Sequence, residues 1–346
     1  RRLTASRTRT KGTTVNAVVL TETGAPDVLR IGTAADPVAG PGEVVVALRA
    51  AALNRRDVFL RKGIAPSPLP VIPGPVGAGV VQAIGAGVSG LAEGDEVVIL
   101  PSLGWGGRED APAPGFRILG GPDDGTYAEL IRIPAENVFP KPGRLSFEEA
   151  AALPLAGLTA YRALVSRARI RSGETVLILG IGGGVATIAL HIARAAGCRV
   201  IVTSSSDEKL ARAADLGAAA GVNYTGGDWV SEVKEISGGG VDVVIDSVGS
   251  TWADSINSVR PGGRVVAFGG TGGAKVELMV RPMTMGQVSF LGTTMGSPRD
   301  FAGLLAAVAH QTWTPVIDSV RPLAEVAEAH AREEAGHHFG KLVLTI

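Results

Sequence analysis

The chain has 346 residues, of which 45% are hydrophobic, 19% are charged and only 4% are aromatic. Because Lys plus Arg and Asp plus Glu both number 33, no net charge draws the protein to nucleic acid or to an acidic membrane. No apolar run approaches the roughly 20 residues that a membrane helix needs, so neither nucleic acid nor a membrane is expected as a partner.

Residues 1–14 are expected to be a disordered tail, because ordered sequence begins abruptly at Val15. The first dozen residues are basic, with no acidic side chain, and they lack the apolar segment of a secretory signal. A mitochondrial-type targeting segment and an upstream extension stay open as alternatives. The single cysteine, Cys198, excludes an internal disulfide and is typical of a reducing compartment, so we expect a cytoplasmic location.

Residues 15 to about 155 are predicted to be mostly β-strand. Short Val-rich runs at 43–48, 79–82 and 95–100 alternate with turns rich in Gly and Pro. The stretch 101–125 is also rich in Gly and Pro but has no clear period, which favours a surface loop that is able to act as a lid.

From Ser172 the pattern changes to strands that alternate with helices. Strands are predicted at Thr175–Leu179, Arg199–Thr203, Val241–Asp246, Arg264–Phe268 and Val288–Gly292, with a weaker one at Gly221–Tyr224. Helices are predicted at Val185–Ala196, Asp207–Leu216, Asp228–Ile236, Thr251–Val259 and Asp300–His310. Parallel strands need helical crossovers, so this alternation indicates an α/β fold with a Rossmann-type, doubly wound parallel sheet. A last strand at Gly340–Ile346 is able to return to the sheet of the first domain.

A glycine-rich turn follows the first of these strands and leads directly into a helix. Glycines allow a tight turn and a close approach of the backbone to a pyrophosphate, and the helix N-terminus offers free N–H groups. The spacing is Gly180-x-x-Gly183-x-x-Ala186 instead of the strict GxGxxG. A turn without a ligand is the alternative, which the repeated strand–helix pattern makes much weaker. We therefore assign dinucleotide binding to Gly180, Gly182, Gly183, Gly184 and Val185.

The end of the second strand bears on which dinucleotide binds. A site for NAD(H) usually has Asp or Glu about 20 residues after the glycines, to hold the ribose 2′-hydroxyl. Here Ser204, Ser205 and Ser206 stand at the strand end, and Lys209 follows on the next helix. Hydroxyl and ammonium groups suit a 2′-phosphate, so we prefer NADP(H) over NAD(H). The alternative is that Ser205 and Glu208 form a capping box and Lys209 is a solvated helix residue.

Several motifs follow one another in a fixed order, which is more specific than any one of them. They are AAALNRRD at 50–57, GAGVV at 77–81, VSGLAEGDEV at 88–97, GTYAE at 125–129, LSFEEAAALP at 145–154, LTAY at 158–161, DSVG at 246–249 and FGK at 339–341. With them the chain resembles the medium-chain dehydrogenase/reductase superfamily, and within it the zinc-independent quinone oxidoreductase branch.

This resemblance implies a GroES-like β-barrel catalytic domain at 15–156, completed by 313–346, and a Rossmann dinucleotide-binding domain at 157–312. The cofactor would lie in the cleft between the two domains, and the protein would form a homodimer. Such proteins pass a hydride from the nicotinamide to an electron-poor carbonyl, quinone or activated alkene.

Residue by residue, the resemblance also implies particular cofactor contacts. Lys209 and Tyr224 fall where NADPH-using relatives contact the adenosine 2′-phosphate, although a half-buried strand tyrosine is the alternative for Tyr224. Thr159 falls near the nicotinamide. Further contacts are expected from Val248, Gly249, Phe268, Gly269 and Lys341.

No metal site is predicted. Zinc-dependent relatives have a cysteine at the position of Asn54, a His-Glu pair where this chain has Pro75-Val76, and a Cys or Asp near Ala156. All five histidines of the chain lie in its second half. The ligands of a tetrahedral zinc site are therefore missing from the first domain.

Without a Lewis acid, another group must stabilise charge on the acceptor oxygen as the hydride arrives. Asn54 is the best catalytic candidate because its amide is able to donate a hydrogen bond there, and a purely structural amide is the alternative. Thr159 is the second candidate, through a bond to the nicotinamide or its ribose. Arg55 reaches either the pyrophosphate or only solvent. Many relatives carry a tyrosine where this chain has Phe59, so no general acid is named.

The sequence thus predicts an NADPH-dependent oxidoreductase that transfers a hydride to a quinone or an α,β-unsaturated carbonyl without a metal. One alternative is an alcohol or aldehyde dehydrogenase activity on the same fold. Another is a cofactor-binding protein with negligible turnover. The substrate itself is a small molecule whose identity the sequence leaves open.

Overall fold

The computed structural model describes residues 14–273 and 275–346. The expected disordered tail therefore lies outside the described residues, apart from Thr14. That residue begins strand β1 (Thr14–Val18), so the predicted boundary at 14 was wrong by one position. β1 pairs antiparallel with β2 (Ile31–Ala35), with Val18 opposite Ile31.

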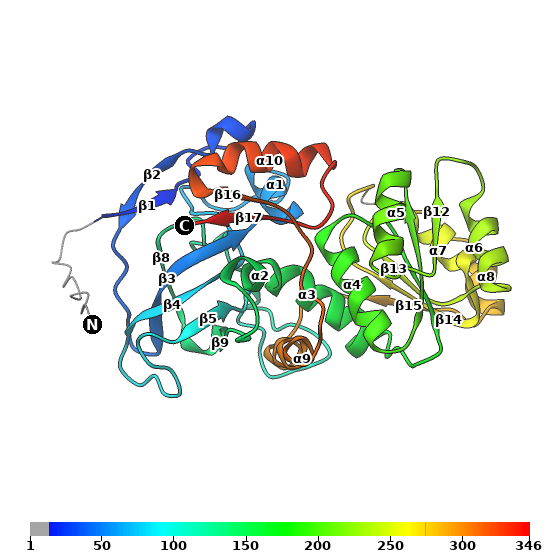
Figure 1. Cartoon of the computed structure of the whole chain (residues 1–346), viewed down its shortest axis with the longest axis horizontal. Coiled ribbons are helices and arrows are strands. Elements are labelled where there is room, and N and C mark those ends of the chain that lie inside the picture. Colours follow the sequence, from blue (N-terminus) through cyan, green and yellow to red (C-terminus); the bar gives the residue numbers. More distant parts are fainter. Residues whose placement is uncertain (1–13, 274) are drawn as a thin grey trace.

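The first part of the chain folds around a seven-stranded sheet with the order β16-β17-β3-β4-β5-β9, in which β8 also pairs with β3. Its strands are β3 (Glu43–Ala52), β4 (Gly77–Ile84), β5 (Glu96–Ile99), β8 (Leu130–Pro134), β9 (Val138–Pro140), β16 (Ile317–Pro322) and β17 (Lys341–Thr345). β17 runs antiparallel to β3, with Val343 opposite Ala52 (Figure 1). The expected return of the last strand to this sheet is confirmed.

The stretch 101–125 is more ordered than the surface loop that we expected. It contains a short hairpin of β6 (Ser102–Leu103) and β7 (Arg117–Ile118), and Trp105 is buried, with only 2% of its surface exposed. The ring of Trp105 meets Phe116 edge to face, and the Arg162 guanidinium lies 4.8 Å from its centroid. The predicted surface loop is confirmed at 106–111, which is irregular and exposed, but one buried aromatic with no periodic pattern around it anchors the rest of the segment.

The second part of the chain forms a six-stranded sheet with the order β12-β11-β10-β13-β14-β15, in which every neighbouring pair is parallel. Its strands are β10 (Thr175–Ile178), β11 (Arg199–Ser204), β12 (Ala220–Asn223), β13 (Val241–Asp246), β14 (Val259–Ala267) and β15 (Ser289–Gly292). All six predicted strands are confirmed. The largest shift is at β14, which begins at Val259 instead of Arg264.

The five helices predicted between and after these strands are confirmed with ends shifted by one or two residues. They are α4 (Gly184–Ala195), α5 (Asp207–Asp215), α6 (Trp229–Ser237), α7 (Trp252–Ser258) and α9 (Pro298–Ala309). The short helix α8 (Val280–Met285) was not predicted.

Other helices had no counterpart in the predicted pattern, because most are too short to show a period. They are α1 (Arg55–Arg61), α2 (Phe147–Ala152), α3 (Pro154–Tyr161), the π-helical turn η3 (Arg162–Arg167) and α10 (Val326–Ala335), with 3₁₀ turns η1 (Pro26–Val28), η2 (Ala135–Asn137) and η4 (Leu323–Glu325). A local signal did exist for α2, since Ser146 accepts from the Glu149 N–H and Glu149 accepts from the Ser146 N–H.

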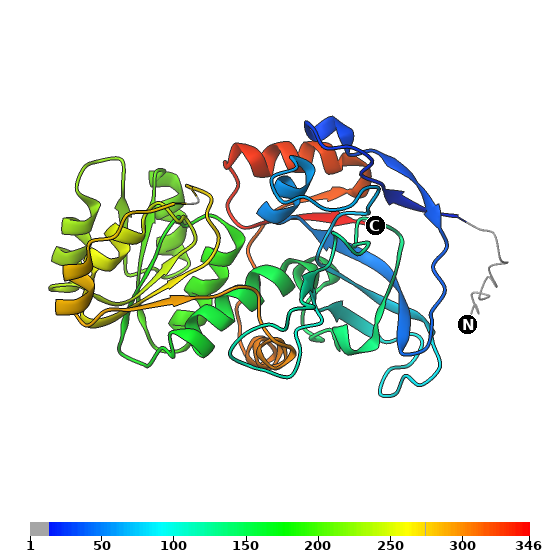
Figure 2. The same cartoon turned by 180° about the vertical axis from the view of Figure 1, so that it is seen from behind.

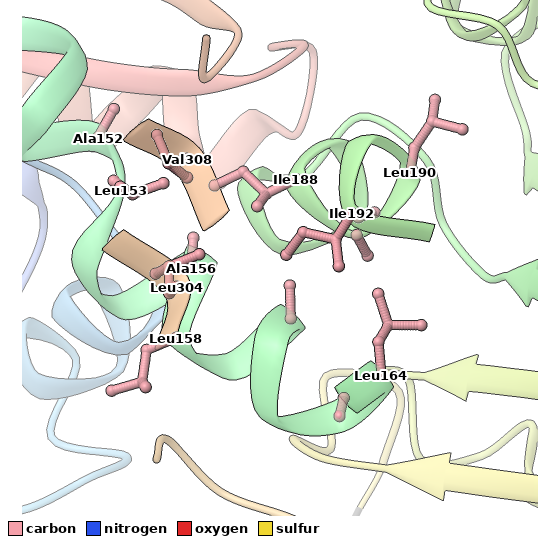
Figure 3. Packing of buried hydrophobic residues seen from close by; sticks show 14 of the residues in the cluster. Ala152, Leu153, Ala156, Leu158, Leu164, Ile188, Leu190, Ile192, Leu304 and Val308 are labelled. Carbon is pink, nitrogen blue, oxygen red and sulfur yellow. The ribbon is translucent and has the colours of Figure 1, made fainter. Parts of the chain in front are cut away.

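Three helices join the two sheets through one hydrophobic cluster. Leu158 of α3, Ile188 of α4 and Leu304 of α9 belong to the same set of buried residues (Figure 3). The view from behind shows α9 beneath the junction of the two parts (Figure 2). This packing sets how the Rossmann sheet faces the first domain, although the predicted domain boundaries stay a prediction. No helix among the described residues is long and apolar enough to cross a membrane.

Candidate active site

The predicted cofactor residues gather along one edge of the Rossmann sheet. β10 lies between β11 and β13, so the strand order reverses beside β10. In sheets of this kind ligands bind outside the carboxyl ends of the strands at the switch point. The glycine turn follows β10, the serines end β11, Tyr224 follows β12, and the loops with Val248 and Phe268 follow β13 and β14.

The glycine turn has the backbone shape that a pyrophosphate requires. Gly180 and Gly182 have φ angles of +67° and +126°, which side chains larger than hydrogen rarely adopt. Gly183 is the N-cap of α4, and the Thr187 N–H donates to its carbonyl at 3.1 Å. The N–H groups before Thr187 have no acceptor within the helix and point out of its N-terminal end. A side chain at Gly183 would meet nothing within 4 Å, so the turn is open to a ligand.

Strand β11 holds this turn in place. The backbone N–H of Gly180 donates to Thr203 Oγ1 at 3.2 Å, and that of Ile181 to the Thr203 carbonyl at 2.8 Å. Ser204 is buried and its Oγ accepts from the Ser206 N–H at 3.2 Å, while Ser205 is exposed. The N-cap of α5 is Ser206, which accepts from the Lys209 N–H, so the alternative of a capping box at Ser205 was wrong by one residue.

Lys209 crosses the glycine turn. Its Nζ donates to the Gly336 carbonyl at 2.6 Å, and a Cβ at Gly182 would lie 3.2 Å from that Nζ. Burial lowers the pKa of Lys209 from its ordinary value, although the Asp318 carboxylate opposes this. Tyr224 lies one residue beyond β12, is 45% exposed and donates its N–H to the Ser204 carbonyl at 3.1 Å. The cationic side chain of Lys209 therefore lies against the turn, whereas Tyr224 follows β12, two strands away from β10.

The loop after β13 is held by the buried carboxylate of Asp246. Its Oδ1 accepts from the N–H groups of Val248 and Gly249, at 2.8 and 3.3 Å. Its Oδ2 accepts from the hydroxyls of Thr251 and Ser255, both at 2.7 Å. The loop with Val248 and Gly249 therefore has a fixed shape beside the glycine turn.

Asn54 stands at the N-terminus of α1 and is 6% exposed. Its backbone N–H donates to Asp57 Oδ2 at 2.9 Å, and its Nδ2 donates to the Ala52 carbonyl at 3.1 Å. Its Oδ1 accepts from Lys341 Nζ at 2.8 Å. The amide is thus held by the protein at both ends, with one Nδ2 hydrogen left over.

Lys341 connects this amide to the glycine turn. Its Nζ also donates to the Leu53 carbonyl, and a Cβ at Gly184 would lie 2.4 Å from its Cδ. Burial lowers the pKa of Lys341 to about 8, against the opposite effect of Glu333 and Asp57.

The buried carboxyl group of Asp57 accepts both of its hydrogen bonds at Oδ2, and its Oδ1 has no hydrogen-bond partner among the described residues. Burial raises the pKa of Asp57 to about 6, while Arg56 and the Asn54 N–H oppose the rise. Tyr127 donates its hydroxyl to Asp57 Oδ2 at 3.1 Å. Sequence reasoning did not assign Asp57, Tyr127 or Glu333 to the site. The spacing from Asn54 to Asp57 was the available signal, because it is that of a helix-capping pair.

Two other candidates have protein partners. Thr159 is 5% exposed and donates its Oγ1–H to the Leu155 carbonyl at 2.8 Å, which leaves its oxygen free only to accept. Arg55 is 38% exposed and lies 3.8 Å from Glu333, at the solvent side of the cleft. His338 is buried with its Nε2 3.3 Å from Glu333, whereas the adjacent His337 is exposed.

Comparison with known proteins agrees with this architecture. The family model "Alcohol dehydrogenase GroES-like domain" matches residues 40–143, and "Zinc-binding dehydrogenase" matches residues 184–310. A zinc-type alcohol dehydrogenase-like protein of Schizosaccharomyces pombe is 36% identical, over 88% of this chain and 91% of that protein. The chain belongs to the medium-chain dehydrogenase/reductase superfamily.

Two further members of the superfamily bear on the activity. The quinone oxidoreductase of Rattus norvegicus is 30% identical, over 95% of this chain and 96% of that protein. A crystal structure described as an NAD-dependent alcohol dehydrogenase is 42% identical, with a TM-score of 0.90 over 96% of this chain and 99% of that chain. Like these members, the protein is an NAD(P)H-dependent oxidoreductase.

The descriptions of the superfamily include zinc, but the residues at the cleft do not fit this ion. Within residues 14–273 and 275–346, no group of three or more His, Cys, Asp or Glu side chains is arranged to hold a metal. The one side-chain oxygen of Asn54 already accepts from the Lys341 ammonium, and a cation beside it would be repelled. A metal-free reaction stays a prediction.

Proposed function

We propose that the protein uses NADPH to reduce a quinone or an α,β-unsaturated carbonyl, without a metal ion. The observation that carries the cofactor preference is the Lys209 ammonium beside the glycine turn, with serines and no carboxylate at the end of β11. A 2′-phosphate next to this ammonium gains a charge-assisted contact, whereas a ribose 2′-hydroxyl gains little.

Bound NADPH supplies a hydride from its nicotinamide ring. The N–H groups at the start of α4 would hold the pyrophosphate, and Lys209, Tyr224, Ser204 and Ser205 would contact the adenosine ribose and its phosphate. The Thr159 oxygen would be the acceptor available to the nicotinamide amide. The remaining N–H of Asn54 would donate to the acceptor oxygen, where negative charge would develop.

An alcohol or aldehyde dehydrogenase is the second candidate. It is favoured by the description of the solved structure that is 42% identical, which names an NAD-dependent alcohol dehydrogenase. A cofactor-binding protein with negligible turnover is the third candidate, because the half-buried Phe59 offers no proton where many relatives carry a tyrosine.

Steady-state assays with a quinone, an enone and an aldehyde, each with NADPH and with NADH, separate these candidates. The proposal expects turnover of the quinone or the enone, with a higher kcat/KM for NADPH. Turnover of the aldehyde alone would favour the second candidate. NADPH binding without turnover of any acceptor would favour the third.

We also propose that the protein is a cytoplasmic homodimer with no macromolecular partner beyond its own copy. The support for a dimer is an apolar surface beside the open sheet edge at β15. Met279, Val280 and Met285 are 72–74% exposed there. The support for the cytoplasm is the single thiol of Cys198. Cell fractionation tests this location. Finding the activity in a fraction other than the cytosol would contradict it.

A further inference from the structure

A lysine and an asparagine that are far apart in the chain form a buried hydrogen bond next to the glycine turn. Lys341 begins β17 and Asn54 precedes α1, and Nζ of the first donates to Oδ1 of the second at 2.8 Å. Both side chains are buried, with 4% and 6% of their surfaces exposed. Moving an ammonium group out of water is unfavourable unless its partners offset the lost hydration. A buried ammonium in such a contact therefore calls for an explanation.

Two acceptors and two carboxylates near Lys341 favour its charged form and partly offset its burial. Its Nζ has the Leu53 carbonyl and Asn54 Oδ1 as acceptors, and the carboxylates of Asp57 on α1 and Glu333 on α10 act on it electrostatically. Asp57 is in turn balanced by Arg56 and by the hydroxyl of Tyr127. The two carboxylates therefore offset the charge of the Lys341 ammonium, while Asn54 Oδ1 accepts one of its hydrogen bonds.

We propose that Lys341 is a positioning residue: its ammonium group fixes the orientation of the Asn54 amide, so that an Nδ2 hydrogen points to the acceptor. The proposal rests on the proposed function, in which Asn54 donates to the acceptor oxygen. It assigns to Lys341 a role that differs from the cofactor contact expected from the sequence.

The chemistry of an amide explains why a fixed orientation matters. The oxygen and nitrogen ends of an asparagine are nearly equal in shape but opposite in hydrogen bonding. An ammonium at Oδ1 forbids the flipped state, in which Nδ2 would face a cation. It also polarises the amide, and hydrogen bonds linked in this way strengthen one another. The Ala52 carbonyl takes one Nδ2 hydrogen at 3.1 Å, which leaves the second for the acceptor.

The direct test is the side-chain amide signal of Asn54 in the whole protein, measured by ¹H–¹⁵N NMR without cofactor or acceptor and assigned through Asn54→Ala. Burial lowers the pKa of Lys341 to about 8, so the signal should move as the pH passes that value and stay constant in Lys341→Met. In Asp57→Asn the midpoint should shift to lower pH, since Asp57 raises the pKa of Lys341. Lys62→Met, at an ion pair with Glu334 on the surface, is the control that should leave the signal unchanged.

Kinetics give the second readout. Lys341→Met should lower kcat by about 10- to 100-fold, which is less than the loss of an oxyanion donor, because the Asn54 amide would be misplaced and not removed. The Kd for NADPH, from a titration, should change less than about 3-fold, because Lys341 acts on Asn54 and not on the cofactor. The double variant with Asn54→Ala should be no slower than Asn54→Ala alone, because one residue acts through the other.

Three results would overturn the proposal. An Asn54 signal that is indifferent both to pH and to Lys341→Met would show that the ammonium does not hold the amide. Additive losses of kcat in the double variant would show independent roles. An equal loss of NADPH affinity and of kcat would assign Lys341 to the cofactor. If the wild-type protein turns over no acceptor while the Asn54 signal still follows Lys341, the proposed function fails and the link between the two side chains stands.

Discussion

At the scale of single residues, the proposed preference for NADPH depends on one ammonium group. Lys209 Nζ donates to the Gly336 carbonyl and lies against the glycine turn, so a 2′-phosphate would have to share this cation with the C-terminal segment. A carbonyl is a weaker partner for an ammonium than a phosphate dianion is. We therefore expect the bond to Gly336 to yield when NADPH binds.

Lys209→Ala should weaken NADPH binding about 10-fold or more, the loss of roughly one charge-assisted contact, and change NADH binding little. Calorimetric titration of both dinucleotides checks this. Lys234→Ala, on helix α6 away from the turn, is the matched control and should affect neither. Equal losses of NADPH and NADH affinity would contradict a role for Lys209 in phosphate recognition.

His330 makes the fold sensitive to acid. It is fully buried against the ring of Tyr127, and neither of its ring nitrogens has a hydrogen-bond partner. Burial lowers the pKa of His330 to about 3, from 6.5. The unfolded chain therefore takes up a proton near pH 6.5 that the folded protein refuses, so stability is present at pH 7 and is lost as the pH falls from about 6.5 towards 3.

This one residue should lower the free energy of unfolding by about 2 kcal/mol between pH 7 and pH 5. Urea unfolding at the two pH values measures the loss, which His330→Leu should largely remove. The control is His337→Gln, which changes an exposed histidine and should keep the full loss of stability between pH 7 and pH 5. An unchanged pH dependence in His330→Leu would contradict the assignment.

At the scale of elements, the loop after β13 illustrates how a strand end is prepared for a ligand. Four donors converge on the carboxylate of Asp246, which is 0% exposed. They fix the backbone at Val248 and Gly249, where the cofactor is expected to lie. The shape of the loop therefore depends on one acceptor more than on packing.

Asp246→Ala should destabilise the protein by about 2–4 kcal/mol, because the buried hydroxyl of Ser255, the half-buried one of Thr251 and two backbone N–H groups would lose their acceptor. Urea unfolding measures this effect, and the Kd for NADPH should rise together with it. Asp246→Asn, which keeps one carbonyl oxygen as acceptor, should show a smaller loss. A fully stable Asp246→Ala protein would mean that the loop holds its shape by other contacts.

There are physical reasons why some elements could not be predicted from the sequence. Helix α10 buries Val326 and Ala329 together with His330 and Glu333, so polar residues interrupt its apolar stripe. By contrast, most Rossmann strands contain a short buried apolar run, such as Val176–Ile178 in β10 and Val200–Val202 in β11, and such runs were visible in the sequence.

Part of the candidate site could be predicted from the sequence and part could not. The glycine turn and Lys209 are local patterns that a sequence displays. The pairing of Asn54 with Lys341 joins residues 287 positions apart, and no periodicity reveals such a contact. Glu333 had no signal because it lies on α10, a helix that was itself not predicted.

At the scale of the whole molecule, the proposed homodimer would cover the sheet edge at β15. In solution the protein should have twice the chain mass, as measured by light scattering. Val280→Glu should shift it to a monomer, since a charge would be buried without a partner. Asp228→Asn, at the exposed N-cap of α6, should leave the mass unchanged. A monomeric wild-type protein at micromolar concentration would contradict the dimer.

The C-terminal segment adds β16 and α10 to the first domain, then passes the glycine turn at Gly340 and ends as β17 in the first domain's sheet. The Gly340 N–H donates to the Gly182 carbonyl at 2.8 Å, and Lys341 follows directly. Two consecutive residues, Gly340 and Lys341, thus join the proposed cofactor site to the proposed acceptor site.

The most direct test is NADPH oxidation by a quinone or an enone, followed by the absorbance of the reduced nicotinamide, before and after exhaustive dialysis against a chelator. The account predicts the same kcat in both samples and no stoichiometric metal in the purified protein. Tightly bound zinc whose removal abolishes turnover, and whose return restores it, would contradict the account.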